Sequence, residues 1–188
     1  MKKMITILMV LLVTTMAFAA YTPASAPTAS TVDITTSNNG VLAHKITEGA
    51  VSNNSTWNSE AAITEAIPVS IGSTAEQSVA YYSVRTNTKK TVAVTVTADA
   101  LHTGTDYYIP YTLTVGAETG NFGAYVASST APTTTPSITL DTGSINTFTH
   151  GMRFLSQEIK VQFSEDYTQS ALEGDYTSTI TFAITATN

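Results

Sequence analysis

Apolar and polar positions alternate most regularly in the last stretch of the chain, Glu173 to Thr187, which reads E-G-D-Y-T-S-T-I-T-F-A-I-T-A-T. Successive side chains of a strand point to opposite faces. One face would carry Tyr176, Ile180, Phe182, Ile184 and Ala186, and the other Thr177, Thr179, Thr181, Thr185 and Thr187. With the Gly174-Asp175 turn ahead of it, this pattern predicts a long, half-buried strand.

The middle of the chain carries two further alternating segments. Gln77 to Thr86 and Thr91 to Ala98 flank the short polar stretch Asn87 to Lys90, and in the second segment valines alternate with threonines. Two such segments around a short polar turn are typical of a β-hairpin. The sequence therefore predicts that these two strands pair with each other.

Two longer apolar segments show irregularities. Tyr107 to Val115 alternates, but Pro110 lacks the backbone N–H that a ladder needs, so an edge strand or a bulge is expected there. In Met152 to Phe163 the first inward apolar residues, Met152 and Phe154, have even numbers, whereas the later ones, Ile159, Val161 and Phe163, have odd numbers. That change predicts a β-bulge between Leu155 and Gln157.

Shorter elements complete the predicted domain, which spans residues 37–188. The short strands expected within it are Val41–Ile46, Pro68–Gly72, Phe122–Ala127, Ile138–Leu140 and Ile145–Thr149, with one or two helical turns at Ser59–Ala66. A first short strand, Thr31–Thr35, is expected in the segment ahead of the domain, residues 20–36, and Asn38-Asn39-Gly40 would be the hairpin turn that follows it. About nine or ten short strands with almost no helical period predict an all-β fold. We expect an antiparallel, immunoglobulin-like or Greek-key β-sandwich.

The first residues predict export. Met1-Lys2-Lys3, an apolar run from Met4 to Val13 and Ala17-Phe18-Ala19 form the three regions of a Sec-type signal peptide, residues 1–19. The apolar run is too short for a membrane anchor. The mature chain would begin at Ala20 with an extended tail, residues 20–36, that is rich in Pro, Ala, Ser and Thr. We expect it in the periplasm, on the cell surface or outside the cell.

The net charge bears on the classes of partner, and the cysteine content bears on what stabilises the domain. The formal net charge is −6, and removing Lys2 and Lys3 with the signal peptide makes it −8. An acidic chain without clustered Lys or Arg argues against nucleic acid or anionic lipid as partners. The chain has no cysteine, so burial of a core has to hold the exported domain together without disulfides.

No residue pattern predicts catalysis, a metal or a cofactor. His44, His102 and His150 lie far apart, and no G-x-S-x-G motif or glycine-rich phosphate loop is present. Glu165, Asp166, Glu173 and Asp175 surround one loop but lack the alternating spacing of a calcium site. We therefore expect a solvated acidic loop and a protein that is not an enzyme.

Trp57 is the only tryptophan and falls in a polar stretch, Asn53 to Glu60. An exposed indole ring in a loop could stack on a sugar. The pattern favours the other alternative, in which the ring anchors the loop by folding back onto the sandwich. The first alternative would make the chain an extracytoplasmic carbohydrate-binding module.

The closing segment A-L-E-G-D-Y-T-S-T-I-T-F-A-I-T-A is similar to the last strand of many bacterial surface β-sandwiches. It resembles most the cysteine-free pilins of the alternate chaperone–usher class. The resemblance implies an incomplete immunoglobulin-like fold, in which an N-terminal extension fills the groove of the next subunit. Residues 20–36 would be that extension here, although only Val32 and Ile34 alternate within it.

The assembly-strand candidates are accordingly Val32, Ile34, Tyr176, Ile180, Phe182 and Ile184. The hypothesis that best unites these features is a secreted or cell-surface structural or adhesive protein without catalytic activity. It would be a pilin-like or filament-type subunit that associates with itself or with other surface proteins. A binding module that uses Trp57 is the alternative, and a hydrolase with a spatially assembled site is a third.

Overall fold

The computed structural model describes residues 40–103, 107–122, 136–147, 151–164 and 173–188. All the described residues belong to one compact unit. The strands in these ranges are β1 (Leu42–Thr47), β2 (Gln77–Thr86), β3 (Thr91–Ala98), β4 (Leu101–Thr103), β5 (Tyr107–Ile109), β6 (Tyr111–Val115), β7 (Glu118–Phe122), β8 (Ser137–Thr139), β9 (Arg153–Gln162) and β10 (Ile180–Thr187). The helices are α2 (Asn54–Ser59) and α3 (Gly143–Asn146).

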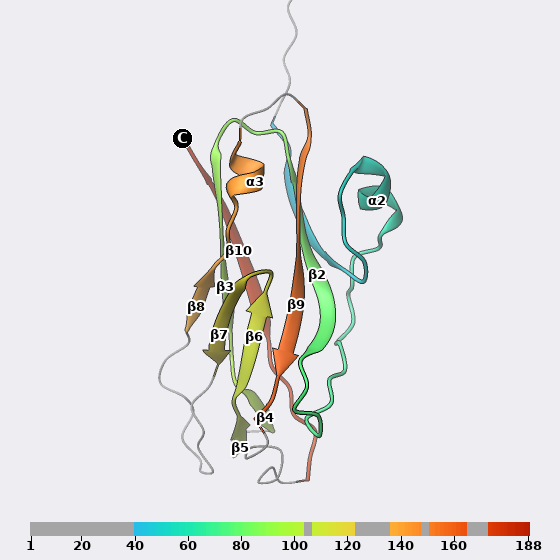
Figure 1. Cartoon of the computed structure of the whole chain (residues 1–188), viewed down its shortest axis with the longest axis vertical. Helices are drawn as coiled ribbons and strands as arrows, with labels where there is room; N and C mark the ends of the chain where they lie inside the picture. The colour runs from blue at the N-terminus through green and yellow to red at the C-terminus, as the bar shows by residue number, and fades with distance from the viewer. Residues whose placement is uncertain (1–39, 104–106, 123–135, 148–150, 165–172) are drawn as a thin grey trace, which may run out of the picture. The chain divides into compact units, whose positions relative to one another are not determined.

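The strands form antiparallel sheets, which confirms the all-β prediction. A five-stranded sheet has the order β1-β2-β9-β6-β7, a three-stranded sheet the order β10-β3-β8, and β4 pairs with β5. Figure 1 shows β10, β3 and β8 as a layer beside the layer that contains β2, β9 and β6. Among the described strands, β1 and β10 each have a partner on one side only, which makes them edge strands of these sheets.

One hydrophobic core lies between the inner faces of the two larger sheets. It takes Ala80, Tyr82 and Val84 from β2, and every second residue of β3, where Val94 and Val96 are fully buried. These positions alternate with polar ones along each strand, because only one face of each sheet turns inward. The core is thus built from the period-two pattern of the sequence.

The predicted hairpin of Gln77–Thr86 with Thr91–Ala98 is wrong, although both strands have the expected bounds. Strand β2 pairs with β1 and β9, whereas β3 pairs with β10 and β8 in the other sheet. The stretch Asn87–Lys90 therefore crosses from one sheet to the other. An alternating pattern marks the buried face of each strand, but it is the same whether two neighbouring strands pair or face each other across a core.

The segment Tyr107–Val115 is two strands, not one. It breaks at Pro110, and β5 pairs with β4 while β6 pairs with β7 and β9. Leu113 and Val115 are buried, but Tyr107 keeps 39% of its surface exposed. Since proline cannot donate to a ladder, the chain leaves one sheet and enters the next at this residue.

The β-bulge predicted between Leu155 and Gln157 is wrong, because the irregularity lies in a different strand. The register irregularity lies in the partner strand β2, between Ser78 and Ala80, and the pairing of β9 runs unbroken from Arg153 to Ile159. Leu155, Ile159, Val161 and Phe163 are buried on one face of the segment. The inward position before Leu155 is occupied by Arg153, whose guanidinium donates to the carbonyl oxygens of Thr88 and Thr147, so Phe154 is not an inward residue.

Both helices lie at positions where the sequence predicted a different structure. Helix α2 lies ahead of the predicted Ser59–Ala66 turns, and Asn53 and Thr56 form a reciprocal capping box at its start, with Thr56 N donating to Asn53 Oδ1 at 2.9 Å and Asn53 N to Thr56 Oγ1 at 3.1 Å. Helix α3 lies where a strand from Ile145 was predicted. The Thr31–Thr35 strand lies outside the described residues, and so does most of Phe122–Ala127.

Candidate functional site: an apolar groove beside the last strand

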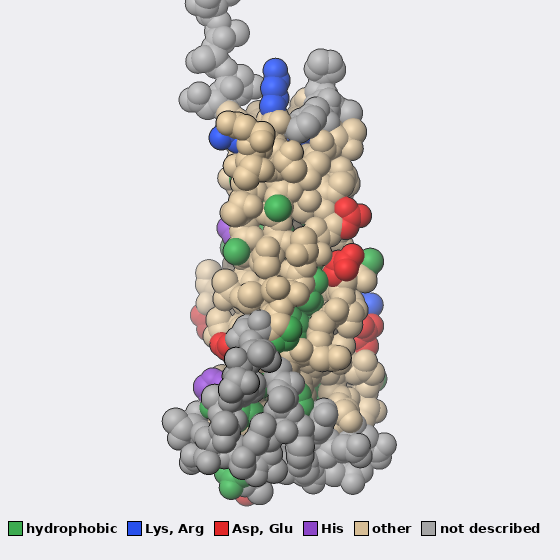
Figure 2. Space-filling view, turned by 90° about the vertical axis from the view of Figure 1, so that its left-hand side faces the viewer, with side chains coloured by type: hydrophobic (Ala, Val, Ile, Leu, Met, Phe, Trp, Pro, Cys, Tyr) green, Lys and Arg blue, Asp and Glu red, His purple; other side chains and the backbone are tan. Residues whose placement is uncertain are grey.

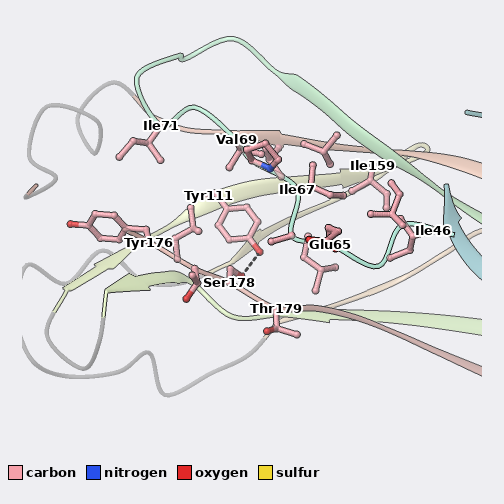
Figure 3. Close-up of a pocket in the computed structure, with 18 of the residues that line it drawn as sticks. Ile46, Glu65, Ile67, Val69, Ile71, Tyr111, Ile159, Tyr176, Ser178 and Thr179 are labelled. Atoms are coloured by element: carbon pink, nitrogen blue, oxygen red, sulfur yellow. Dashed lines mark hydrogen bonds between the residues drawn. The ribbon is translucent and has the colours of Figure 1, made fainter. Parts of the chain in front are cut away.

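A groove of about 860 Å³ opens between β10 and the connection from α2 to β2. Figure 3 shows Ile67, Val69 and Ile71 on one side, Tyr176, Ser178 and Thr179 on the other, and Tyr111 between them. Apolar side chains of the core also line it, among them Leu101, Ile159, Val161 and Phe163. We name residues 63–71, which form the first side, the strap.

Both walls of the groove consist of consecutive residues. One wall includes every residue from Gly174 to Ile180, and the other every residue from Ile63 to Val69. A strand that turned only a face to the groove would contribute alternate residues. Consecutive residues show that each wall presents its backbone as well as its side chains.

The backbone of the β10 wall has one side without a partner strand. Thr177 N donates to His102 O and Thr177 O accepts from His102 N, both at 2.9 Å, and Thr179 O accepts from Asp99 N at 3.4 Å. Alternate residues of a strand direct their N–H and C=O to opposite sides, so residues 178, 180 and 182 direct theirs to the other side. Within the described ranges no strand pairs with β10 there.

The apolar face of β10 is only half-buried. Ile180, Phe182 and Ile184 are intermediate in exposure, although they pack against a core in which the paired β3 valines are almost fully enclosed. Among the assembly-strand candidates, Tyr176, Ile180 and Phe182 line the groove, whereas Ile184 lies farther along β10. The other two candidates, Val32 and Ile34, lie outside the described residues.

A tyrosine hydroxyl lies in the groove floor, and the other polar residues of the lining are Thr64, Glu65, Asp175, Tyr176, Thr177, Ser178 and Thr179. Tyr111 Oη and Ser178 Oγ lie 3.0 Å apart, and Ser178 Oγ donates to the backbone oxygen of Asp99 at 2.6 Å. Burial raises the pKa of Tyr111 above its ordinary value, the Ser178 contact lowers it in part, and the negative charge of Asp99 raises it further. Burial also raises the pKa of the core residue Tyr82.

These raised values predict that the protein loses stability in alkali. In the unfolded chain both hydroxyls would ionise near pH 10, before they do in the folded chain. Their contribution to the free energy of unfolding is complete below about pH 10 and is lost as the pH rises through the higher folded pKa values. We expect denaturant unfolding between about pH 8 and pH 11.5 to show this fall, and Tyr111→Phe to make it shallower. An identical fall in that variant would contradict the assignment to Tyr111.

Trp57 lies on α2 and is only 9% exposed. Lys45 Nζ lies 4.6 Å and Arg85 Cζ 4.8 Å from the ring centroid. Lys45 Nζ also donates to the carbonyl oxygen of Trp57 at 2.5 Å and to that of Glu60. Two cations and the strands β1 and β2 thus surround the indole ring, so it anchors α2 and presents no open face on which a sugar could stack.

The other polar candidates do not come together. His44, on β1, has its Nδ1 3.1 Å from Tyr82 Oη on β2, whereas His102, on β4, pairs with Thr177. Glu165, Asp166 and His150 lie outside the described residues, and the described ranges hold no group of three or more His, Asp or Glu side chains placed to bind a metal. Figure 2 shows a face with few charged side chains, on which several Asp and Glu side chains lie along the right-hand side and some of the Lys and Arg side chains lie at the upper end.

The strand predicted at Pro68–Gly72, which overlaps the strap, is wrong, because the structure has no strand between α2 and β2. No prediction placed the strap at a site. Its signal was present, because Ile67, Val69 and Ile71 alternate with Pro68 and Ser70.

None of the helices in the described ranges is long and apolar enough to cross a membrane. The site thus defines an all-β protein with an apolar groove at a sheet edge. Comparisons with family models, curated proteins and solved structures find no match for this chain.

Proposed function

We propose that this chain is an exported structural subunit of a pilin-like or filament type, without catalytic activity, and that its groove accepts an extended segment of a second copy. The observation that carries the proposal is the unpaired side of β10 along an apolar groove with backbone on both walls. An added strand satisfies such an edge with main-chain hydrogen bonds and gains affinity from alternate side chains in the groove. The predicted signal peptide agrees with a role outside the cytoplasm.

The strand order supports an immunoglobulin-like reading of the sandwich. Constant-type immunoglobulin domains have sheets ABED and CFG. Here β1, β2, β9 and β6 correspond in chain order and sheet order to A, B, E and D, and β3 and β10 to C and F. Strand G would pair with β10 on the side that faces the groove. A segment from another copy in that place would complete the domain.

We propose residues 20–36 of the second copy as the occupant. This segment lies in the 39 residues ahead of Gly40, where the described part begins. Its 17 residues can span roughly 60 Å when extended, which is enough to reach a neighbouring molecule. Val32 and Ile34 would be the two side chains that enter the groove. Since Asp33 is the only charged side chain of the segment, burial of its backbone against β10 costs little desolvation of ionic side chains.

Size-exclusion chromatography with light scattering, followed by negative-stain microscopy, tests this function. We expect the full chain to form oligomers or fibres, and deletion of residues 20–36 to leave monomers. The double variant Val32→Asp with Ile34→Asp should lose assembly as the deletion does, because a carboxylate cannot enter the groove without desolvation. The matched control is Thr31→Ala with Thr35→Ala on the opposite face, which should still assemble. A monodisperse full chain, or assembly that survives the deletion, would overturn the proposal.

A further inference from the structure

Two cations lie close together on the outer face of the five-stranded sheet. Tyr82 and Val84 of β2 belong to the core, so Arg85, which follows them, points to the outer face. The register of β1 with β2 makes Lys45 the diagonal neighbour of Arg85 on that face. Lys45 Nζ and Arg85 Cζ lie 4.6 and 4.8 Å from the centroid of the Trp57 ring. We name Lys45 and Arg85 the cation pair.

The cation pair has no carboxylate within ion-pair distance among the described residues, whereas Lys160 on β9 has such partners. Glu60 accepts from Lys45 Nζ with its main-chain oxygen, while its carboxylate accepts from Gly49 N at 3.1 Å. Arg85 Nε is buried and has no hydrogen-bond partner in the same part of the chain. A buried N–H of a cation without an acceptor costs free energy, which an anionic ligand would recover.

An aromatic side chain lies next to Arg85 on the same face. Phe154 of β9 is the cross-strand partner of Arg85, and both side chains are half-buried, so each retains contact with solvent. The planar guanidinium of an arginine donates two parallel hydrogen bonds to a carboxylate. A partly exposed phenyl ring offers an apolar surface to the C–H groups of a sugar. Together these two groups match a ligand that carries a carboxylate on a sugar ring.

We propose that the cation pair and Phe154 form a binding site for an acidic sugar of the uronate class. The carboxylate lies on Arg85 and one face of the sugar ring on Phe154. Lys45 adds its positive charge and is held in place by its bonds to the main-chain oxygens of Trp57 and Glu60. The acidic charge of the rest of the chain is screened beyond about 8 Å at physiological ionic strength. None of the three binding residues lines the groove, so this activity is separate from assembly.

Titration calorimetry on the full chain tests the site, with fluorescence as a local reporter, because Trp57 is the only tryptophan. The probe is a short oligogalacturonate, its methyl ester is the neutral control, and acetate supplies a carboxylate without a sugar ring. We expect the acidic oligomer to bind, to change the Trp57 emission and to bind more weakly as salt is added. Absence of binding, binding without a change in emission, or equal binding of the ester would overturn the site. Acetate that binds as tightly as the oligomer would overturn its assignment to a sugar.

Four variants measure what each side chain contributes. Arg85→Gln should weaken oligogalacturonate binding roughly tenfold or more, and Arg85→Lys, which keeps a cation beside Trp57, should weaken it less. Phe154→Ala should weaken binding of the oligomer severalfold. Lys160→Gln removes the same charge from a lysine that already has carboxylate partners, and should leave the affinity within about twofold. Equal affinity of Arg85→Gln and Lys160→Gln, both folded by denaturant unfolding, would contradict the proposal. All four should assemble as the unchanged chain does, so a failure here leaves the proposed function standing.

Discussion

Replacement of Tyr82 by alanine is expected to lower the free energy of unfolding by about 3–5 kcal/mol, the range for truncation of a large buried aromatic side chain. Tyr82 is fully buried on β2, and its ring stacks on that of Phe182 with centroids 4.2 Å apart and an interplanar angle of 9°. The pair joins the five-stranded sheet to the edge strand β10. Its loss would open a cavity beside the strand that lines the groove.

Denaturant unfolding of Tyr82→Ala measures this effect, and Tyr107→Ala is the matched control. Tyr107 has the same side chain but is 39% exposed, so its truncation should cost less than about 1 kcal/mol. Tyr82→Phe keeps the stacked ring and removes the hydroxyl that lies 3.1 Å from His44 Nδ1, which should cost about 0.5–1.5 kcal/mol. Similar losses in the two alanine variants would show that the Tyr82–Phe182 stack does not join the sheets.

Replacement of Trp57 by alanine is the second large effect, with an expected loss of about 3 kcal/mol in the free energy of unfolding. The indole ring is buried between Lys45 and Arg85, and its removal takes away both contacts with the cations. Helix α2 has only six residues and cannot hold its place by its own hydrogen bonds. We expect it to detach from β1 and β2 before the rest of the domain unfolds.

Hydrogen exchange in α2 and denaturant unfolding together measure this change. Asn58→Ala, on the same helix but exposed, is the control and should stay within about 0.5 kcal/mol of the unchanged chain. The same two proteins distinguish the anchoring role of Trp57 from sugar binding. If Trp57→Ala kept full stability but lost binding to a glycan that the unchanged chain binds, the indole would be a ligand platform and not an anchor.

Several features of the fold could be read from local pattern alone. The bounds of β2 and β3 were predicted correctly, and so was the alternation of β10, because a period of two follows from strand geometry and the requirement for one buried face. Three apolar residues of the predicted closing strand, Tyr176, Ile180 and Phe182, line the groove. These predictions depend only on neighbours along the chain.

Contacts between distant segments decided the rest. The alternation of β2 and β3 is the same for paired and for facing strands, so their assignment to different sheets had to come from the packing of β9 and β10 against them. The sequence neighbours of Trp57 are polar, and its ring is buried because Lys45 and Arg85, from other parts of the chain, pack against it. The groove itself requires β10 and the strap, more than one hundred residues apart, to lie on either side of Tyr111. By itself the sequence determined which residues form most of the strands and which faces of those strands turn inward, since both follow from local alternation. Only the tertiary structure decided which strands pair and which edge stays open, because strand pairing depends on contacts that no local pattern encodes.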